Sequence, residues 1–375
     1  MKARLRWRNS RLAWLLIMLA VLASPAPALA WSEGEILQLV AGGGEQPDGS
    51  PAVSAALKSP FGVDFTPDGS LIFVELTGER VRKIDRAGIL STIGGTGVKG
   101  DGGDGGPARE AAFNGMHSLV VLPAGDIVMA DTWNNKLRKI DPRSGLVSTF
   151  AGTGRKGFGG DGGPATKADF GGIYCVARDP SRKHLYLADL DNRRIRAIDL
   201  ETSIVTTVAG NGAKGVPQDG AKAVEAPLVD PRAVAADAQG RVYILERGGH
   251  ALRVVKADGT IETLVGTGKP GDTGDGGDAR QATMNGPKHL CLDFDGNLLI
   301  ADTENHRVRK YLMDSRTIVP IAGSGRRGKE GVGGPPLQAQ LFQPHGVTVH
   351  SDGTLYISDS GNNRILKIAR PRPTR

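Results

Sequence analysis

The chain repeats itself about every 57 residues, and this period constrains its fold more than any other feature of the sequence. A glycine closes an apolar, β-branched run six times, at Gly42, Gly95, Gly152, Gly210, Gly266 and Gly323. An acid follows a second apolar run six times, at Glu75, Asp131, Asp189, Glu246, Asp302 and Asp359. Because the two markers advance independently with the same period, the sequence predicts six copies of one supersecondary unit.

The second copy shows what each repeat contains. Apolar and β-branched residues dominate four short runs, at 117–122, 126–130, 136–140 and 146–151, and turn-forming residues separate them. No segment after residue 30 sustains the period of a helix. Repeated four-stranded units protect their sheet edges by closing into a ring. We therefore expect an all-β fold, a six-bladed β-propeller of four-stranded antiparallel blades.

The two ends of the chain predict how the ring closes. The sixth copy holds three strands, and the proline-containing tail at 371–375 cannot supply a fourth. An extra strand stands at the beginning of the chain instead, at 35–40. Pairing of this strand with the last blade would remove a free sheet edge. We expect one propeller domain at 31–370, with its ring closed by the N-terminal strand, followed by the tail.

The first 30 residues have the composition of a secretory signal. Five cations lie within the first 11 positions, an apolar run follows at 12–23, and Ala28-Leu29-Ala30 offers a cleavage site. About 12 apolar residues are too few to span a bilayer, which takes roughly 20. We expect removal of this signal peptide at 1–30 and export of a soluble chain to the periplasm or the extracellular space, without membrane attachment.

Composition narrows the function classes once the signal is set aside. The net charge of +7 includes the five signal cations, so the mature chain carries about +2. Few aromatic residues remain to stack on bases, which argues against nucleic acid as a partner. The two cysteines, Cys175 and Cys291, are too few for a disulfide-stapled fold or a cysteine zinc cluster. They fall in non-adjacent blades, so we expect two free thiols.

The repeated acid predicts a turn rather than a catalytic group. An Asn or a Gly stands three residues after each acid, and both tolerate the left-handed conformation. We expect that residue to be left-handed and the acid to accept backbone N–H groups. An arginine recurs seven residues after the acid, which predicts ion pairs within or between blades. These arginines are Arg82, Arg138, Arg196, Arg253 and Arg309.

Glycine- and aspartate-rich loops recur between copies and leave two interpretations open. Several acids on one flexible loop suit calcium, but Gly and Asp are also typical of tight turns. We favour turns, because no loop has a complete EF-hand spacing. The acids are Asp101, Asp104, Asp161, Asp275 and Asp278.

Several sequence blocks repeat together, and through them the chain resembles the NHL-repeat family, in its exported bacterial type. The blocks include Thr-Phe-Ala-Gly-Thr-Gly at 149–154, Gly-Asp-Gly-Gly-Pro-Ala at 160–165 and Ala-Asp-Thr-Glu-Asn-His-Arg-Val-Arg at 301–309. The resemblance covers about residues 36–369 and implies the same propeller. Functions in this family range from binding scaffolds to lyases, so the fold decides little about function. Two copies depart from the pattern, with Glu75 and Glu246 replacing Asp, and Gly78 and Gly249 replacing Asn.

One aligned position varies where the others repeat. It opens the first strand of each copy and holds Phe61, His117, Tyr174, Arg232, Lys288 and His345. The first strand of a propeller blade is innermost, so these side chains border one mouth of the central channel. Convergent polar groups at such a mouth are typical of a ligand site, although they would also suit the lining of a wet channel. No acid occupies the position, so nothing in this ring neutralises its two cations.

Two classes of function follow from this ring. The first, which we favour, is a binding scaffold that holds a protein partner or a small anionic ligand through His117, Tyr174, Arg232, Lys288 and His345. The second is a metal-assisted lyase or hydrolase at the same mouth. The resemblance extends distantly to peptide-amidating lyases, whose propellers hold zinc through three histidines on alternate blades. His117 and His345 match two of those positions, but Arg232 occupies the third. We assign no catalytic residue, expect a monomer, and expect no cofactor, with zinc or calcium as the alternatives.

Overall fold

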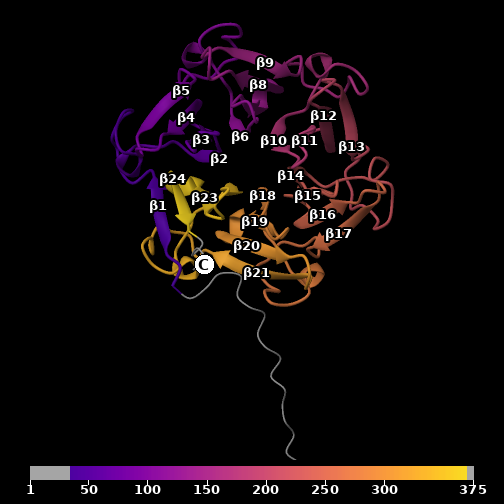
Figure 1. Cartoon of the computed structure of the whole chain (residues 1–375). Helices are drawn as coiled ribbons and strands as arrows, with labels where there is room; N and C mark the ends of the chain where they lie inside the picture. The colour runs from indigo at the N-terminus through magenta and orange to yellow at the C-terminus, as the bar shows by residue number, and fades with distance from the viewer. Residues whose placement is uncertain (1–33, 370–375) are drawn as a thin grey trace, which may run out of the picture.

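The computed structural model describes residues 34–369, which form six sheets of four antiparallel strands arranged around a ring (Figure 1). The expected six-bladed β-propeller is confirmed. The signal expected at 1–30 and the tail at 371–375 lie outside the described residues. Within the described residues, no helix has the length and apolar character needed to cross a membrane.

The first three blades use the strands in chain order. Blade 1 contains β2 (Pro60–Phe65), β3 (Leu71–Glu75), β4 (Arg80–Ile84) and β5 (Leu90–Gly94). Blade 2 contains β6 (Met116–Val121), β7 (Ile127–Asp131), β8 (Lys136–Ile140) and β9 (Val147–Ala151). Blade 3 contains β10 (Ile173–Arg178), β11 (His184–Asp189), β12 (Arg194–Asp199) and β13 (Val205–Ala209). The strand ends expected for the second copy differ from these by at most one residue.

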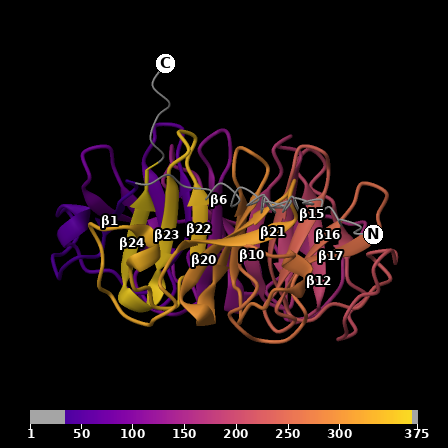
Figure 2. The same cartoon turned by 90° about the horizontal axis from the view of Figure 1, so that it is seen from below.

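The remaining blades follow the same order, and the last one borrows its fourth strand from the start of the chain. Blade 4 contains β14 (Pro231–Ala236), β15 (Val242–Glu246), β16 (Ala251–Val255) and β17 (Ile261–Val265). Blade 5 contains β18 (His289–Leu292), β19 (Leu298–Asp302), β20 (Arg307–Leu312) and β21 (Thr317–Ala322). Blade 6 contains β22 (Gly346–Val349), β23 (Leu355–Asp359), β24 (Arg364–Ile368) and β1 (Leu37–Ala41). Strands β22, β23 and β24 of blade 6 run between the two faces of the ring (Figure 2).

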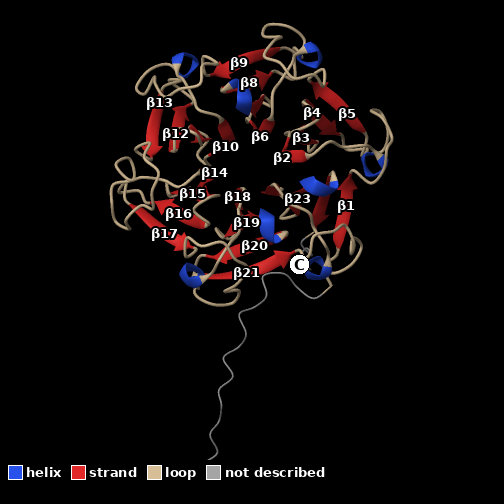
Figure 3. Ribbon diagram, turned by 180° about the vertical axis from the view of Figure 1, so that it is seen from behind, coloured by secondary structure: helices blue, strands red, loops and turns tan. Residues whose placement is uncertain are grey.

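Short 3-10 turns are the only helical elements of the described chain (Figure 3). Five lie in the loops that connect blades: η1 (Ala52–Ser54), η2 (Ala108–Glu110), η4 (Ala165–Lys167), η5 (Ala279–Gln281) and η7 (Pro336–Gln338). Three lie between the second and third strands of a blade: η3 (Thr132–Asn134), η6 (Thr303–Asn305) and η8 (Ser360–Asn362).

The N-terminal strand closes the ring, as expected from the ends of the chain. β1 pairs antiparallel with β24, with Leu37 opposite Ile368. It is therefore the outermost strand of blade 6, and Figure 1 shows the first strand beside the last ones. This pairing covers the outer edge of β24.

Side chains of one innermost strand bond to the free backbone edge of the next one around the channel. Ser118 Oγ donates to the carbonyl of Val176 at 3.3 Å. His289 Nδ1 accepts the N–H of Val347 at 3.4 Å, and burial lowers the pKa of His289 to about 4. His289 is therefore an inter-blade contact. Cys175 and Cys291 also lie on innermost strands, and both are free thiols, as predicted.

The repeated acids hold the loops between blades. Each of the six is fully buried. In blade 2, Asp131 Oδ1 accepts the N–H of Asn114 at 2.7 Å, and Oδ2 accepts the side-chain amide of Asn134 at 2.8 Å. Arg138 lies 3.5 Å from Asp131, and the other four arginines of this position pair with their acids in the same way. The predicted structural role of acid and arginine is confirmed.

The predicted position of the left-handed residue is wrong by one. Asn134 belongs to η3, and the residue after it, Asn135, has a φ of 54°. The amide of Asn134 also donates to the carbonyl of Gly100 at 2.7 Å, so its side chain is needed inside the turn. The left-handed residue is the fourth after the acid in every blade: Glu79, Asn135, Arg193, His250, His306 and Asn363.

In blades 1 and 4 a glutamate replaces the repeated aspartate and a glycine replaces the asparagine, and the two replacements compensate each other. A Cβ on Gly78 would lie 2.4 Å from Glu75 Oε2, and one on Gly249 would lie 2.7 Å from Glu246 Oε2. The longer glutamate thus occupies the space that the asparagine fills elsewhere, which leaves room only for glycine.

The aspartates of the inter-blade loops bond to side chains and backbone of the protein. Asp104 pairs with Arg138 at 2.7 Å, and Asp101 pairs with Lys136 at 2.8 Å. Asp161 and Asp275 pair with the corresponding arginines of blades 3 and 5, and Asp278 caps η5 through the N–H of Arg280. These contacts support the interpretation of the loops as turns.

Candidate functional site

The variable residues of the innermost strands meet at one mouth of the channel. The ring of Phe61 lies 5.2 Å from that of His117 and 4.2 Å from that of His345. The ring of Tyr174 lies 4.6 Å from that of His117, and the guanidinium of Arg232 lies 4.3 Å from the centre of the Tyr174 ring. The structure therefore brings together the residues that the repeat alignment placed at this mouth.

The six side chains lie at different depths. Phe61, His117 and Arg232 are only 4%, 7% and 4% exposed, and we call these three the floor. Tyr174, Lys288 and His345 are half-buried and form the wall. We call this arrangement the mouth site.

Arg232 is a buried cation without an ion-pair partner among the described residues. Among residues 34–369 no carboxylate forms an ion pair with its guanidinium, and the nearby Asp230 pairs with Arg247 instead. Its Nε is buried without a hydrogen bond, and Nη1 donates to the carbonyl of Tyr174 at a long 3.4 Å. Burial lowers the pKa of Arg232 to about 10. A buried charge without a partner destabilises the folded protein unless a group of opposite charge binds to it.

Lys288, in contrast, is neutralised, and the expectation of two unpaired cations is wrong for it. Lys288 Nζ lies 2.8 Å from Glu304 Oε1. The other oxygen, Oε2, accepts the side-chain amide of Gln343 at 2.8 Å. Burial lowers the pKa of Lys288, and the nearby Arg232 also acts in this direction. Glu304 was not found from the first-strand alignment because it comes from the turn between β19 and β20.

A third cation, Arg247, completes the charged side of the site. It pairs with Asp230 at 2.7 Å. Burial is the main reason why the pKa values of His117 and Lys288 are lowered, and the charge of Arg247 adds to this effect. Arg247 stands one residue after the repeated acid Glu246, and Glu304 stands two residues after the repeated acid Asp302. Variation at those positions was the signal that would have found both residues. On the charged side of the site, formed by blades 4 and 5, three cations and two carboxylates leave one excess positive charge.

Both histidines of the site are neutral at neutral pH. His117 Nδ1 lies 2.7 Å from the carbonyl of Gly115, and His345 Nδ1 lies 2.8 Å from the carbonyl of Gln343. Because a carbonyl only accepts, each Nδ1 carries the proton and each Nε2 carries a lone pair. Burial, together with the cations nearby, holds the pKa of both well below the usual value.

The residues of the mouth do not fit a three-ligand zinc site. Histidines oriented through Nδ1 are suited to ligate a metal through Nε2. The third position, however, is the cation Arg232, which would repel a metal ion. Within residues 34–369, no three His, Cys, Asp or Glu side chains are grouped so that they could hold a metal ion.

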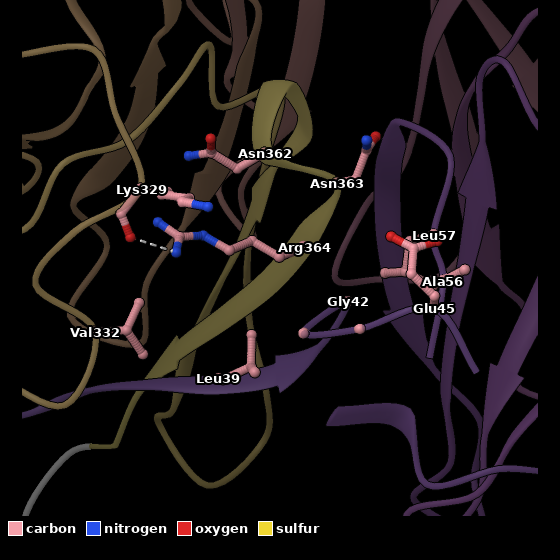
Figure 4. Close-up of a pocket in the computed structure, with 12 residues that line it drawn as sticks. Leu39, Gly42, Glu45, Ala56, Leu57, Lys329, Val332, Asn362, Asn363 and Arg364 are labelled. Carbon is pink, nitrogen blue, oxygen red and sulfur yellow. Dashed lines mark hydrogen bonds between the residues drawn. The ribbon is translucent and has the colours of Figure 1, made fainter. Parts of the chain in front are cut away.

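A separate cavity of about 340 Å³ lies at the closure seam between β1 and β24 (Figure 4). In blades 1, 3 and 5, an arginine stands five residues after the repeated acid and packs on a glycine of the loop that leads to the next blade. The pairs are Arg80 with Gly97, Arg194 with Gly212 and Arg307 with Gly325. In blade 6, Leu366 replaces the usual acid-binding arginine, and Arg364 pairs with Asp359 at 2.7 Å instead. The loop around Gly44 stays uncovered, which explains the cavity.

Comparisons with known proteins identify sequence repeats along much of the chain. The family model of the teneurin NHL domain matches residues 165–271, and the NHL repeat model matches 284–311 and 343–368. The Arabidopsis thaliana protein SUPPRESSOR OF QUENCHING 1, chloroplastic, is 26% identical over 275 residues, which are 70% of this chain and 26% of that protein. Mouse teneurin-3 is 30% identical over 264 residues, 62% of this chain and 9% of that protein. The chain thus spans about a quarter or less of these relatives.

Solved structures show the same fold at low sequence identity. An auxiliary nutrient binding protein from Bacteroides thetaiotaomicron superposes with a TM-score of 0.65 at 15% identity, covering 89% of this chain and 76% of that one. A catalytically inactive virginiamycin B lyase from Staphylococcus aureus superposes with a TM-score of 0.52 at 12% identity, covering 87% and 83%. At such identities the likeness concerns the fold alone.

Proposed function

We propose that this chain, which carries NHL repeats and folds as a six-bladed β-propeller, is an exported binding protein whose channel mouth holds a small ligand bearing one carboxylate. The observation that carries the proposal is Arg232, a buried guanidinium with no carboxylate partner among the described residues.

A bound carboxylate would supply the missing partner. The guanidinium offers a planar set of N–H donors that matches two carboxylate oxygens. Its Nη1 makes one long hydrogen bond, so donors remain for a ligand. Because Arg232 is only 4% exposed, each new contact with its guanidinium would be stronger than in bulk solvent.

The charge balance favours a ligand with a single negative charge. Lys288 and Arg247 are already paired with Glu304 and Asp230. A monoanion would neutralise the one remaining cation, whereas a second negative charge would meet the two protein carboxylates. Affinity should fall as salt rises, because mobile ions screen the attraction.

Two further observations support a binding role outside the cytoplasm. The first 30 residues have the order of a secretory signal, with cations, an apolar run and a cleavage site. Similar propellers of solved structure include proteins described as auxiliary nutrient binding proteins. N-terminal sequencing of the protein recovered after expression with its full N-terminus should find residues near Trp31, and recovery of Met1 would contradict export through this signal.

Calorimetric titration tests the carboxylate proposal. Acetate, propionate and butyrate, each compared with its amide, would be titrated into the protein and into an Arg232→Met variant. We expect the acids to bind and the amides not to, with at least a tenfold loss of affinity in the variant. Arg143→Met is the matched control, because Arg143 is exposed in the β8–β9 turn on the opposite face. Equal binding of acids and amides, or an unaffected Arg232→Met variant, would overturn the proposal.

Metal analysis separates this function from the second candidate. The free Nε2 atoms of His117 and His345 are the observation in favour of a metal-assisted lyase or hydrolase. One equivalent of tightly held zinc in the purified protein would support that enzyme and contradict the anion-binding site.

A further inference from the structure

Trp133 is an exposed aromatic residue at the edge of the mouth site. It lies in η3, two residues after Asp131, and it is 45% exposed. Its ring packs closely on Gly115, where an added Cβ would lie 2.2 Å from a ring carbon. Lys99 Nζ lies 5.2 Å from the ring centre. A large aromatic side chain so placed leaves apolar surface open to solvent at a candidate binding site.

A continuous series of ring contacts joins Trp133 to Arg232. The Trp133 ring lies 5.7 Å from His117, His117 lies 4.6 Å from Tyr174, and Tyr174 lies 4.3 Å from the Arg232 guanidinium. The indole and the guanidinium therefore lie within about 15 Å of each other, since these three separations connect them. One small molecule can reach both groups.

The mouth site is divided into an aromatic side and a charged side. Blades 6, 1, 2 and 3 contribute aromatic and imidazole rings, which are His345, Phe61, His117, Trp133 and Tyr174. Blades 4 and 5 contribute the charged groups Arg232, Arg247, Lys288 and Glu304. A ligand that matches both sides needs an aromatic part and an ionised part at opposite ends.

The depth of these groups sets the orientation of such a ligand. Arg232 is only 4% exposed, so the group that binds it must be small, as a carboxylate is. Trp133 is 45% exposed, so its indole is accessible to a ring from solvent. Lys99 is an exposed and flexible side chain, so it can move from the indole when a ring stacks there.

From these contacts we propose that the ligand of the mouth site is an aromatic monocarboxylate, whose ring stacks on Trp133 while its carboxylate binds Arg232. The inference rests on the proposed function for the carboxylate and adds the ring. Stacked aromatic pairs contribute beyond the apolar area that they bury, and tryptophan offers a large rigid surface for such a contact. Phenylalkanoates with linkers of one to three carbons carry both groups and vary the separation between them.

The test compares ligands that differ by one part. Phenylacetate, 3-phenylpropionate and 4-phenylbutyrate would be titrated calorimetrically beside propionate and 3-phenylpropionamide. We expect the best phenylalkanoate to bind at least tenfold more tightly than propionate. Trp133→Leu should remove this advantage, and Trp133→Phe, which keeps a ring, should retain most of it. Phe294→Leu is the control, because Phe294 is 63% exposed and lines a cavity distinct from the mouth site.

The outcomes separate the ring from the carboxylate. Equal affinities for propionate and 3-phenylpropionate, both lost in Arg232→Met, would overturn the aromatic proposal and leave the carboxylate site intact. Equal affinities for 3-phenylpropionate and its amide, both lost in Trp133→Leu, would support the ring contact and overturn the carboxylate function. Absence of binding by every compound at millimolar concentration would overturn both.

Discussion

Replacing Arg232 with methionine should make the ligand-free protein more stable. The side chain is 4% exposed, carries a charge without an ion-pair partner among the described residues, and leaves Nε without a hydrogen bond. Methionine follows the path of the arginine stem but needs no neutralisation, and buried charges are often replaced by apolar side chains with a gain in stability. Residues that serve binding commonly make the folded protein less stable than an apolar residue at the same position would.

The magnitude follows from the pKa and the contacts that would be lost. Burial lowers the pKa of Arg232 to about 10, which corresponds to about 3 kcal/mol against the charged side chain. Because the folded pKa lies below the unfolded value, this penalty is fully present at neutral pH and is relieved only above pH 10. The variant loses the contact with the Tyr174 ring, worth about 1 kcal/mol. It also loses the long hydrogen bond to the Tyr174 carbonyl, about 0.5 kcal/mol. The net expectation is a gain of about 1 to 2 kcal/mol.

Denaturant unfolding at pH 7, followed by circular dichroism, measures this change against two controls. Arg232→Lys keeps the charge and should give no gain. Arg138→Met removes an equally buried arginine that pairs with Asp104 and Asp131, so it should lose about 3 to 5 kcal/mol. The two arginine-to-methionine variants thus have opposite signs. A loss of more than about 1 kcal/mol in Arg232→Met would show that the fold itself satisfies this guanidinium, which would refute the reasoning.

Three further predictions concern the repeats, the closure and the pH dependence of binding. Glu75→Asp alone should lower the free energy of unfolding by about 2 kcal/mol, because it leaves buried groups unpaired. Gly78→Asn alone should lower it by about 2 kcal/mol, because the asparagine overlaps Glu75. The double variant should have a free energy of unfolding within about 1 kcal/mol of that of the parent. Additive losses in denaturant unfolding would contradict this compensation. Deleting residues 34–41 uncovers the outer edge of β24, and light scattering with a thermal melt should detect aggregation or loss of cooperativity, unless another segment closes the ring. A bound carboxylate should raise the depressed pKa values of His117 and His345, so affinity should increase as the pH falls from neutrality through the raised values, and titration in that acidic range, in buffers of different ionisation enthalpy, should show proton uptake. A binding enthalpy independent of the buffer would disprove this linkage.

The sequence alone determined the architecture because each repeat carries its own local instructions. Glycines and acids recur wherever the chain must turn, and the alternation of apolar runs between them places the strands to within one residue in blade 2. The N-terminal strand was assigned to the last blade by counting strands, since a ring leaves one place unfilled. The mouth residues were found in the same way, because an aligned position that varies among repeating ones stands out in a periodic sequence.

Only the tertiary structure decided which of those residues are paired. Arg232 and Lys288 occupy the same aligned position, yet Lys288 meets Glu304 from a neighbouring turn and Arg232 meets no carboxylate among the described residues. Trp133 and Arg247 join the site from turns whose side-chain directions the repeat does not encode. The left-handed residue follows Asn134 because the amide of that asparagine is held inside the turn by Asp131. Such choices depend on the reach and direction of individual side chains across blades, which a periodic pattern of residue types does not specify.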